Sequence, residues 1–376
     1  MRVEQSERGA GREIRTAAPG AEPEALRRAY LDLLKLCLCD LAGSSTTSVR
    51  GLPHGRVVSR ELSGDELSVR ADAGDWPAHG LTMIGLRRLD DLEGCVTQIV
   101  SDRVEGNLIE AGCWRGGASI LMRATLDVLG ADDRTVWAAD SFQGFPRDAA
   151  TGGRAEDELE TVEPFLAAFD FLAAPLEEVR ASFARFGCER GTRFLPGFFE
   201  DTLPGLTGHR WALVRLDADT YDSTMLALRC LYPALSTGGY LIVDDYGDIA
   251  ECRAAVDHFR DEHAIHEPIE WIDSSCVRWR RESETPLSIE LPPRPSQSAR
   301  SAAPERRQGR IPTEAELELA DKLADALKRL ALAEQELRAA REIERRFDEV
   351  TSSTSWRITK PLRDLSLRLR GLGRRR

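Results

Sequence analysis

Short apolar runs alternate with segments of helical periodicity between residues 106 and 281, and this alternation constrains the fold more than any other feature of the sequence. The runs are "GNLIEAG", "TVWAADSF", "GTRFLPGFF", "RWALVRLDAD" and "GGYLIVDDYG", followed by the strand-like "IEWIDSSCVRWRR". Strands separated by helices pair mostly in parallel, and helices then cover both faces of the sheet. The pattern therefore predicts an α/β, doubly wound, Rossmann-like fold.

The sequence before these strands predicts two helices joined by a loop. "EALRRAYLDLLKLCLCDLAG" (24–43) has apolar residues at helical spacing and ends at Gly43, so we expect an amphipathic helix. Residues 44–80 have the composition of a loop, and another helix is predicted within 76–102.

Changes in composition divide the chain into five predicted regions. These are a disordered N-terminus (1–22), the α/β domain (23–283), a Pro/Ser/Arg-rich linker (284–312), a charged helix (313–350) and a basic tail (351–376).

The charged helix carries a heptad pattern. One seam has leucine at every seventh position and the other is mostly alanine, which predicts a coiled coil, most simply a homodimer. A solvated single helix is the alternative. The two seams consist of Leu323, Leu330 and Leu337, and of Leu319, Ala326, Ala333, Ala340 and Phe347.

Charge and cysteine content narrow the choice of compartment and partner. The net charge is −12, which disfavours nucleic-acid binding, because phosphate contacts require a basic surface. The eight cysteines include no C-x-x-C pair, which favours free thiols in a reducing compartment. No apolar signal core and no membrane-length apolar run is present, so we expect a cytoplasmic protein. The basic tail favours contact with the anionic inner face of a membrane as much as it favours a solvated, disordered segment.

A glycine-rich turn and the acid after it indicate a cofactor site. "EAGCWRGGAS" (110–119) joins a strand to a helix, and Asp140 ends the next strand, where a carboxylate can accept hydrogen bonds from ribose hydroxyls. The alternatives are glycines required for packing and an Asp140 that caps its own turn. No Walker lysine motif is present, which leaves NAD and S-adenosylmethionine as candidates.

Aspartates follow two strands that would be neighbours in a methyltransferase-like sheet. Asp217 and Asp219 leave one strand, and Asp244 and Asp245 leave the next. Carboxylates so close together repel, and a divalent cation resolves the conflict, with Mg²⁺ favoured and Mn²⁺ or Ca²⁺ as alternatives. Solvated loop ends are the simpler explanation. We expect Asp222 to cap a helix that begins near Ser223.

Taken together, these motifs resemble those of the macrocin O-methyltransferase family, which includes the mycinamicin and novobiocin sugar methyltransferases. The resemblance extends from about Tyr30 to Arg281 through "TMIGLRRLDDL", "LIEAGCWRGGAS", "AADSFQGFP", "GFFEDTLP" and "LVRLDADTYDSTMLALRCLYPALSTGGYLIVDDYG". It implies an S-adenosylmethionine methyltransferase fold, a requirement for Mg²⁺ and methylation of a deoxysugar hydroxyl.

The resemblance also implies a role for particular residues. Asp217, Asp244 and Asp245 would bind the metal, and Asp217 would be the catalytic base, with solvent acting through the metal as the alternative. Asp219 would lie outside the metal's direct ligands. The cofactor-binding set would be Glu110, Gly112, Trp114 and Gly116 at the methionine part, Asp140 and Ser141 at the ribose, Thr82 and Met83 closing over the cofactor, and Gly197 near the adenine.

The C-terminal extension departs from this family. "STSWRITKPLR" resembles a tail found on bacterial glycosyltransferases, which favours an acceptor sugar in a surface or lipid-linked glycan over a macrolide. Two other functions remain open from the residues alone. They are an NAD-dependent sugar-modifying enzyme and an inactive scaffold that works through its coiled coil.

Overall fold

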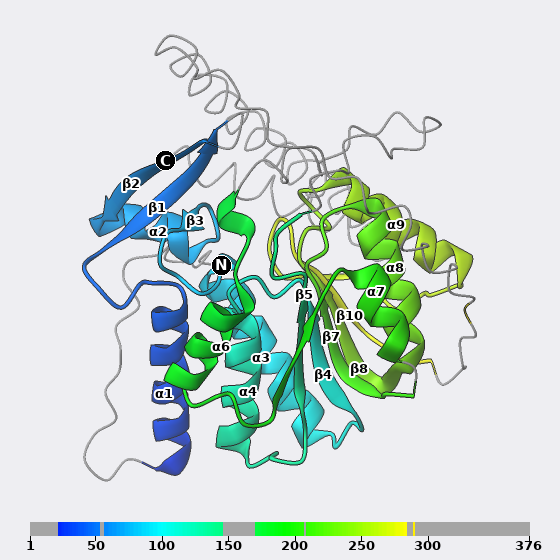
Figure 1. Ribbon diagram of the computed structural model, residues 1–376. Coiled ribbons are helices and arrows are strands. Elements are labelled where there is room, and N and C mark those ends of the chain that lie inside the picture. The colour runs from blue at the N-terminus through cyan, green and yellow to red at the C-terminus, as the bar shows by residue number, and fades with distance from the viewer. Residues whose placement is uncertain (1–21, 53–55, 146–169, 207, 284–288, 290–376) are drawn as a thin grey trace, which may run out of the picture. The chain divides into compact units, whose positions relative to one another are not determined.

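The structure is a computed structural model that describes residues 22–52, 56–145, 170–206, 208–283 and 289 (Figure 1). All of them belong to the first of two units, residues 1–308. The predicted disordered N-terminus, linker, coiled coil and basic tail lie outside the described residues, apart from Glu22 and Ile289.

A seven-stranded sheet forms the centre of the domain, in the order β6-β5-β4-β7-β8-β10-β9. β6, β5, β4, β7 and β8 pair in parallel, whereas β10 runs antiparallel to both β8 and β9. The predicted mostly parallel α/β fold is confirmed. The strands are β4 (Asn107–Ala111), β5 (Val136–Asp140), β6 (Thr192–Pro196), β7 (Trp211–Leu216), β8 (Leu235–Val243), β9 (Glu270–Trp271) and β10 (Val277–Arg280).

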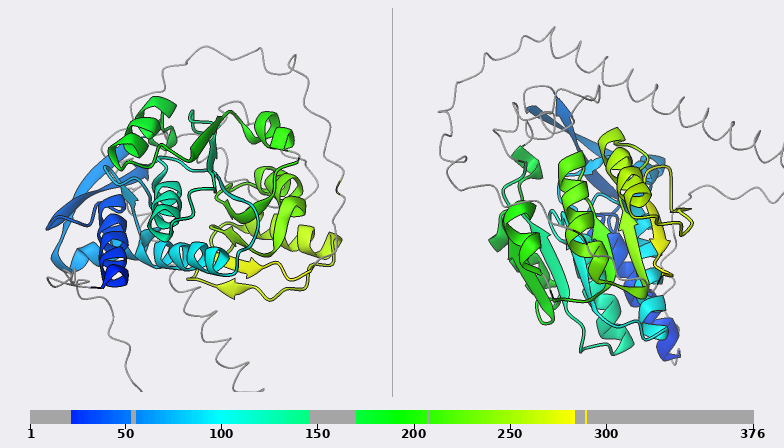
Figure 2. Two further views of the ribbon diagram at one scale, coloured as in Figure 1. Left: turned by 90° about the horizontal axis from the view of Figure 1, so that it is seen from below. Right: turned by 90° about the vertical axis from the view of Figure 1, so that its right-hand side faces the viewer.

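Helices cover both faces of this sheet, as the three views show (Figures 1 and 2). One face packs against α1 (Pro23–Leu38), α3 (Gly85–Ser101), α4 (Gly117–Leu129) and α6 (Leu176–Arg185). The other packs against α7 (Phe199–Thr202), α8 (Tyr221–Leu231) and α9 (Ala250–Glu262). The short 3-10 helices are η2 (Gly64–Glu66), η4 (Asp170–Leu172), η5 (Leu203–Leu206) and η6 (Tyr232–Ala234).

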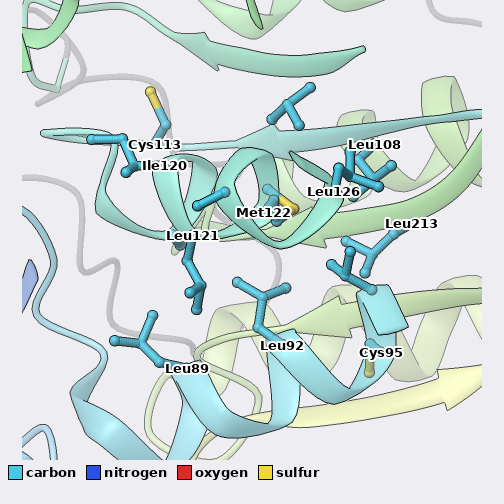
Figure 3. Packing of buried hydrophobic residues seen from close by; sticks show 14 of the residues in the cluster. Leu89, Leu92, Cys95, Leu108, Cys113, Ile120, Leu121, Met122, Leu126 and Leu213 are labelled. Atoms are coloured by element: carbon cyan, nitrogen blue, oxygen red, sulfur yellow. The ribbon is translucent and has the colours of Figure 1, made fainter. Parts of the chain in front are cut away.

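The strand side chains divide into two hydrophobic cores because successive residues of a strand face opposite sides. On β4, Leu108 belongs to the core under α3 and α4, and Ile109 belongs to the core under α8 and α9. Figure 3 shows Leu89 and Leu92 of α3 directed toward Leu121 of α4, and all three side chains are almost fully buried. Burial on both faces explains why the strands appear in the sequence as continuous apolar runs.

The loop predicted for residues 44–80 is wrong. β1 (Ser45–Leu52) and β2 (Arg56–Ser63) pair antiparallel, β3 (Trp76–Pro77) adds to β1, and a short helix, α2 (Leu67–Ala71), lies between β2 and β3. This small sheet is organised around a buried charge. Arg70 has no exposed surface and donates to both carboxylate oxygens of Asp75 at 2.7 Å. Because this buried ion pair takes the place of most of an apolar core, the segment lacks the hydrophobic pattern by which strands are predicted.

Element boundaries also differ from the predictions. The first helix ends at Leu38 rather than Gly43. The helix predicted within 76–102 is confirmed as α3, Gly85–Ser101. The eight cysteines are all free, as expected. Among the described residues, no helix is long and apolar enough to cross a membrane.

Candidate active site

A cavity of about 1040 Å³ opens at the carboxyl ends of the central strands. Its walls include Gly112 after β4, Asp140 at the end of β5, Asp217 after β7 and Asp244 after β8. The predicted cofactor turn and the predicted metal ligands therefore meet in one space. This is the edge of a parallel sheet where ligands of doubly wound folds bind.

The glycine turn after β4 is required by close packing as well as by the cavity. Gly112 has φ +89°, and a Cβ atom on it would lie 1.9 Å from the carbonyl oxygen of Asp217. Gly116 has φ +84°, and a Cβ there would lie 2.4 Å from the ring of Phe183. The packing explanation for the glycines thus holds at both positions. Gly112 also lines the cavity, whereas Gly116 does not.

Asp140 combines the two roles considered for it. Its carboxylate accepts hydrogen bonds from the backbone N–H of Trp114 at 2.9 Å and of Phe142 at 2.8 Å. Burial raises the pKa of Asp140, although these backbone hydrogen bonds oppose the rise. The same side chain lines the cavity beside Ser141. The amides therefore fix the orientation of a carboxylate that still has lone pairs available to a ligand.

Glu110 lies beneath the cavity rather than in its wall. It is 2% exposed, accepts from the Ser119 hydroxyl, and accepts from Nη1 of Arg215 at 2.7 Å. Burial raises the pKa of Glu110 to about 7, even though Arg215 opposes this. In this structure the Glu110 carboxylate is paired with Arg215. A direct contact between Glu110 and the cofactor stays a prediction.

Four further predicted residues differ in their placement. Met83 and Trp114 line the cavity, but Thr82 and Gly197 do not. The Thr82 hydroxyl accepts from the N–H of Ile84 at 3.4 Å, just before α3 begins. The N–H of Gly197 donates to the carbonyl of Asp140 at 2.9 Å. Both therefore support segments next to the cavity.

Three of the four strand-end aspartates form a compact cluster. Asp217, Asp244 and Asp245 each offer a carboxylate oxygen within 4.8 Å of the others. Burial raises the pKa of Asp245 far above its usual value, and the charges of Asp219 and Asp217 raise it further. Its Oδ2 is buried and has no hydrogen-bond partner among the described residues. An orphaned carboxylate oxygen within a set of hard oxygen donors fits a small divalent cation.

Asp219 lies beside this cluster but is not one of its three residues. It lines the cavity and has φ +57°, an uncommon conformation for a residue other than glycine. Burial and the charge of Asp217 raise the pKa of Asp219 to about 8. Asp217, Asp219 and Asp245 therefore carry an electrostatic conflict that a cation would relieve, whereas Arg215 and Arg88 lower the pKa of Asp244.

The cap predicted at Asp222 is wrong. The helix α8 begins at Tyr221, and the Thr220 hydroxyl caps it by accepting from the N–H of Ser223 at 3.3 Å. Asp222 is an exposed residue of the first turn. The left-handed residue Asp219 turns the chain, so the helix starts two residues earlier than predicted.

Two arginines of the site were missed by the sequence reasoning. Arg215 is 2% exposed within β7 and contacts Glu110, Asp217 and Asp244. Arg88, near the start of α3, lines the cavity and contacts Asp244 at 2.6 Å. The signal for Arg215 was present, because a charge inside the apolar run "WALVRL" must be paired when that strand is buried. No comparable pattern marked Arg88.

The wall of the cavity also includes residues of the N-terminal sheet. Asp75 and Trp76 line it, and Trp76 packs on Phe171 with ring centroids 4.8 Å apart. These residues were missed because their segment was predicted to be a loop.

Comparisons with known proteins agree with this architecture. The sequence model of the family described as Macrocin-O-methyltransferase (TylF) matches residues 29–281. The chain is 42% identical to the 8-demethyl-8-(2,3-dimethoxy-alpha-L-rhamnosyl)-tetracenomycin-C 4'-O-methyltransferase of Streptomyces olivaceus, over 71% of this chain and 98% of that protein. It is 40% identical to the mycinamicin III 3''-O-methyltransferase of Micromonospora griseorubida, over 67% of this chain and 96% of that protein.

A solved structure is similar in both sequence and fold. The O-methyltransferase NovP superposes with a TM-score of 0.60 at 38% identity, covering 68% of this chain and 100% of that one. The part of this chain that these proteins share is the α/β domain that bears the cavity.

Proposed function

Since this chain belongs to the macrocin O-methyltransferase family and is an O-methyltransferase, we propose that it methylates a sugar hydroxyl with S-adenosylmethionine and a divalent cation, most simply Mg²⁺. One observation carries the proposal. The carboxylates of Asp217, Asp244 and Asp245 lie within 4.8 Å of one another and border the same cavity as Gly112 and Asp140. Family membership disfavours the NAD-dependent alternative.

The cofactor would lie along the ends of β4 and β5. The Gly112 turn allows close approach of its methionine part, and the Asp140 carboxylate is oriented to accept hydrogen bonds from ribose hydroxyls. Met83 and Trp114 supply apolar wall on the same side. A cofactor bound by these residues would share the cavity with the aspartates, and alignment of the two reactants would supply much of the rate acceleration.

The aspartates would hold the acceptor in place. Asp217, Asp244 and Asp245 would hold the cation, which would supply charge that attracts the sugar hydroxyls and lowers the pKa of the hydroxyl to be methylated. The bond from this oxygen to the methyl carbon forms as the carbon–sulfur bond breaks, which leaves S-adenosylhomocysteine. The hydroxyl proton must pass to a base in the same step.

Asp217 is our choice for that base, with solvent as the alternative acceptor. Without the cation, burial and the charge of Asp244 raise the pKa of Asp217. A bound cation would lower that pKa again, so the choice of Asp217 rests on its place in the carboxylate cluster that would face the acceptor. Its side chain is 28% exposed, so a proton taken from the acceptor can continue to solvent.

The acceptor class follows from the relatives and the tail. The names of two relatives specify methylation of a rhamnosyl derivative of tetracenomycin C and of mycinamicin III, so a sugar acceptor is the simplest choice here. We favour a surface or lipid-linked glycan because of the "STSWRITKPLR" tail. A cytoplasmic homodimer formed through residues 313–350, with the basic tail at the membrane surface, would suit such an acceptor.

Calorimetry and single substitutions test this function. We expect S-adenosylmethionine to bind, EDTA to abolish methyl transfer, and Asp217→Asn to lower the rate by about 100-fold or more while cofactor affinity is retained. Asp132→Asn removes an exposed carboxylate after α4 and serves as the control. Full activity in EDTA would refute the metal role. NAD binding without S-adenosylmethionine binding would refute the cofactor, and binding of neither would favour the scaffold.

A further inference from the structure

Arg88 connects three parts of the domain at the edge of the aspartate cluster. It lies on the first turn of α3, and its side chain is 11% exposed. Its Nη1 donates to Asp244 Oδ2 at 2.6 Å, and its Nε donates to Asp273 Oδ2 at 2.6 Å. Asp273 is itself held between β9 and β10, because its Oδ1 accepts from the N–H of Ser275 at 2.9 Å. The guanidinium is thus fixed at both of its edges.

Asp244 is held by two guanidinium groups at once. Its Oδ2 accepts from Arg88, and its Oδ1 accepts from Nη2 of Arg215. The side chain is 6% exposed and has no freedom to rotate without breaking a buried ion pair. The next residue, Asp245, differs sharply, since its Oδ2 is buried with no partner among the described residues. Two adjacent aspartates on one strand end are therefore held in very different ways.

We propose that Arg88 is a positioning residue for the cation site, and this inference rests on the proposed function. By occupying one lone pair of Asp244 Oδ2, Arg88 fixes the direction of the lone pair that remains for a cation. Asp245 provides an oxygen with no partner among the described residues, and Asp217, whose Oδ2 accepts from Arg215 at 3.1 Å, borders the cavity beside it. Hydrogen-bonded partners behind metal ligands commonly control affinity in this way, and their removal costs 10-fold to 100-fold in metal binding.

A different role for Arg88 would produce the opposite result. A guanidinium beside a bound cation also repels it, so an arginine present only to balance the aspartates would weaken cation binding. Its removal would then tighten binding. The positioning role predicts weaker binding upon removal, and the sign of the change distinguishes the two.

The experiment measures Mn²⁺ affinity of the full-length chain by electron paramagnetic resonance titration, without turnover. We expect Arg88→Leu to bind Mn²⁺ about 10-fold or more weakly. Arg88→Lys should recover part of this loss, because an ammonium group can reach Asp244 but cannot donate to both partners in a fixed fork. Arg87→Leu is the matched control, since Arg87 is the exposed neighbour on the same helix, and we expect it to bind as the unsubstituted chain does.

Cofactor affinity and melting temperature, measured on the same samples, separate a local effect from a general loss of structure. The proposal expects S-adenosylmethionine affinity to stay within about twofold in Arg88→Lys while Mn²⁺ affinity falls. Equal or tighter Mn²⁺ binding by Arg88→Leu and Arg88→Lys would overturn the positioning role alone. If the unsubstituted chain bound no Mn²⁺, the cation site itself would be refuted and this inference with it.

Discussion

Replacing Gly112 by alanine tests how the cofactor turn and the metal ligands share one strand edge. The new Cβ would lie 1.9 Å from the carbonyl oxygen of Asp217 and would sit on a backbone with φ +89°. Backbone strain in such a region costs about 1–3 kcal/mol, and overpacking costs a further ~1–3 kcal/mol. We therefore expect Gly112→Ala to lower the free energy of unfolding by roughly 2–6 kcal/mol, a large part of the ~5–15 kcal/mol typical of a domain.

The chain offers two matched glycines that separate these contributions. Gly130 has φ +70° with nothing within 4 Å of the new Cβ, so Gly130→Ala carries strain alone and should cost about 1–2 kcal/mol. Gly94 is an exposed position inside α3, also with nothing within 4 Å. Gly94→Ala should stabilise the protein by about 0.5–1 kcal/mol.

Urea denaturation followed by circular dichroism measures all three variants at constant slope. The expected order of stability is Gly94→Ala, unsubstituted, Gly130→Ala and then Gly112→Ala. If Gly112→Ala lost no more stability than Gly130→Ala, the close approach of β4 to the end of β7 would be refuted.

Three further predictions follow from the charges and the cap. Arg215→Met leaves buried carboxylates without their partner, and we expect a loss of about 3–5 kcal/mol in unfolding free energy by urea titration; a loss below ~1 kcal/mol would contradict the buried network. Asp219 has a folded pKa of about 8, above its usual value of 3.8, so its contribution to stability is present below pH ~4 and lost as the pH rises toward 8. In EDTA at pH 8, Asp219→Asn should therefore melt higher than the unsubstituted chain, and Mg²⁺ should reduce that difference; an equal or lower melting temperature in EDTA would refute the conflict. Thr220→Ala should cost about 1 kcal/mol through loss of the α8 cap, and Asp222→Ala should cost less; the reverse order would restore Asp222 as the cap.

Local patterns carried most of the fold prediction. The apolar runs of β4, β7 and β8 were predicted as strands because both faces of the central sheet are buried, which makes each strand a short, continuous apolar run. The β1–β2 hairpin was missed for the opposite reason. Its sheet is organised by the buried Arg70–Asp75 pair, and ion pairs leave no periodic hydrophobic signal.

Within the site, residue type was easier to predict than the partner of each residue. Asp217, Asp244 and Asp245 were chosen from their places at strand ends, and the structure brings these three together. Glu110 was assigned to the cofactor from the family resemblance, but its carboxylate pairs with Arg215 in the buried network. The alternation of side chains along a strand does not predict which neighbouring strand a buried charged side chain will contact.

The alternating elements, the glycine turn and the acids at the strand ends could be predicted from the sequence, since they depend on residues close together along the chain. Which acids share a space, and which are neutralised, depends on contacts between distant elements. Arg88 and Asp244 are separated by 156 residues, and Arg88 and Asp273 by 185. Their contact exists because α3 packs beside the end of β8, and packing between distant elements has no local signature in the sequence.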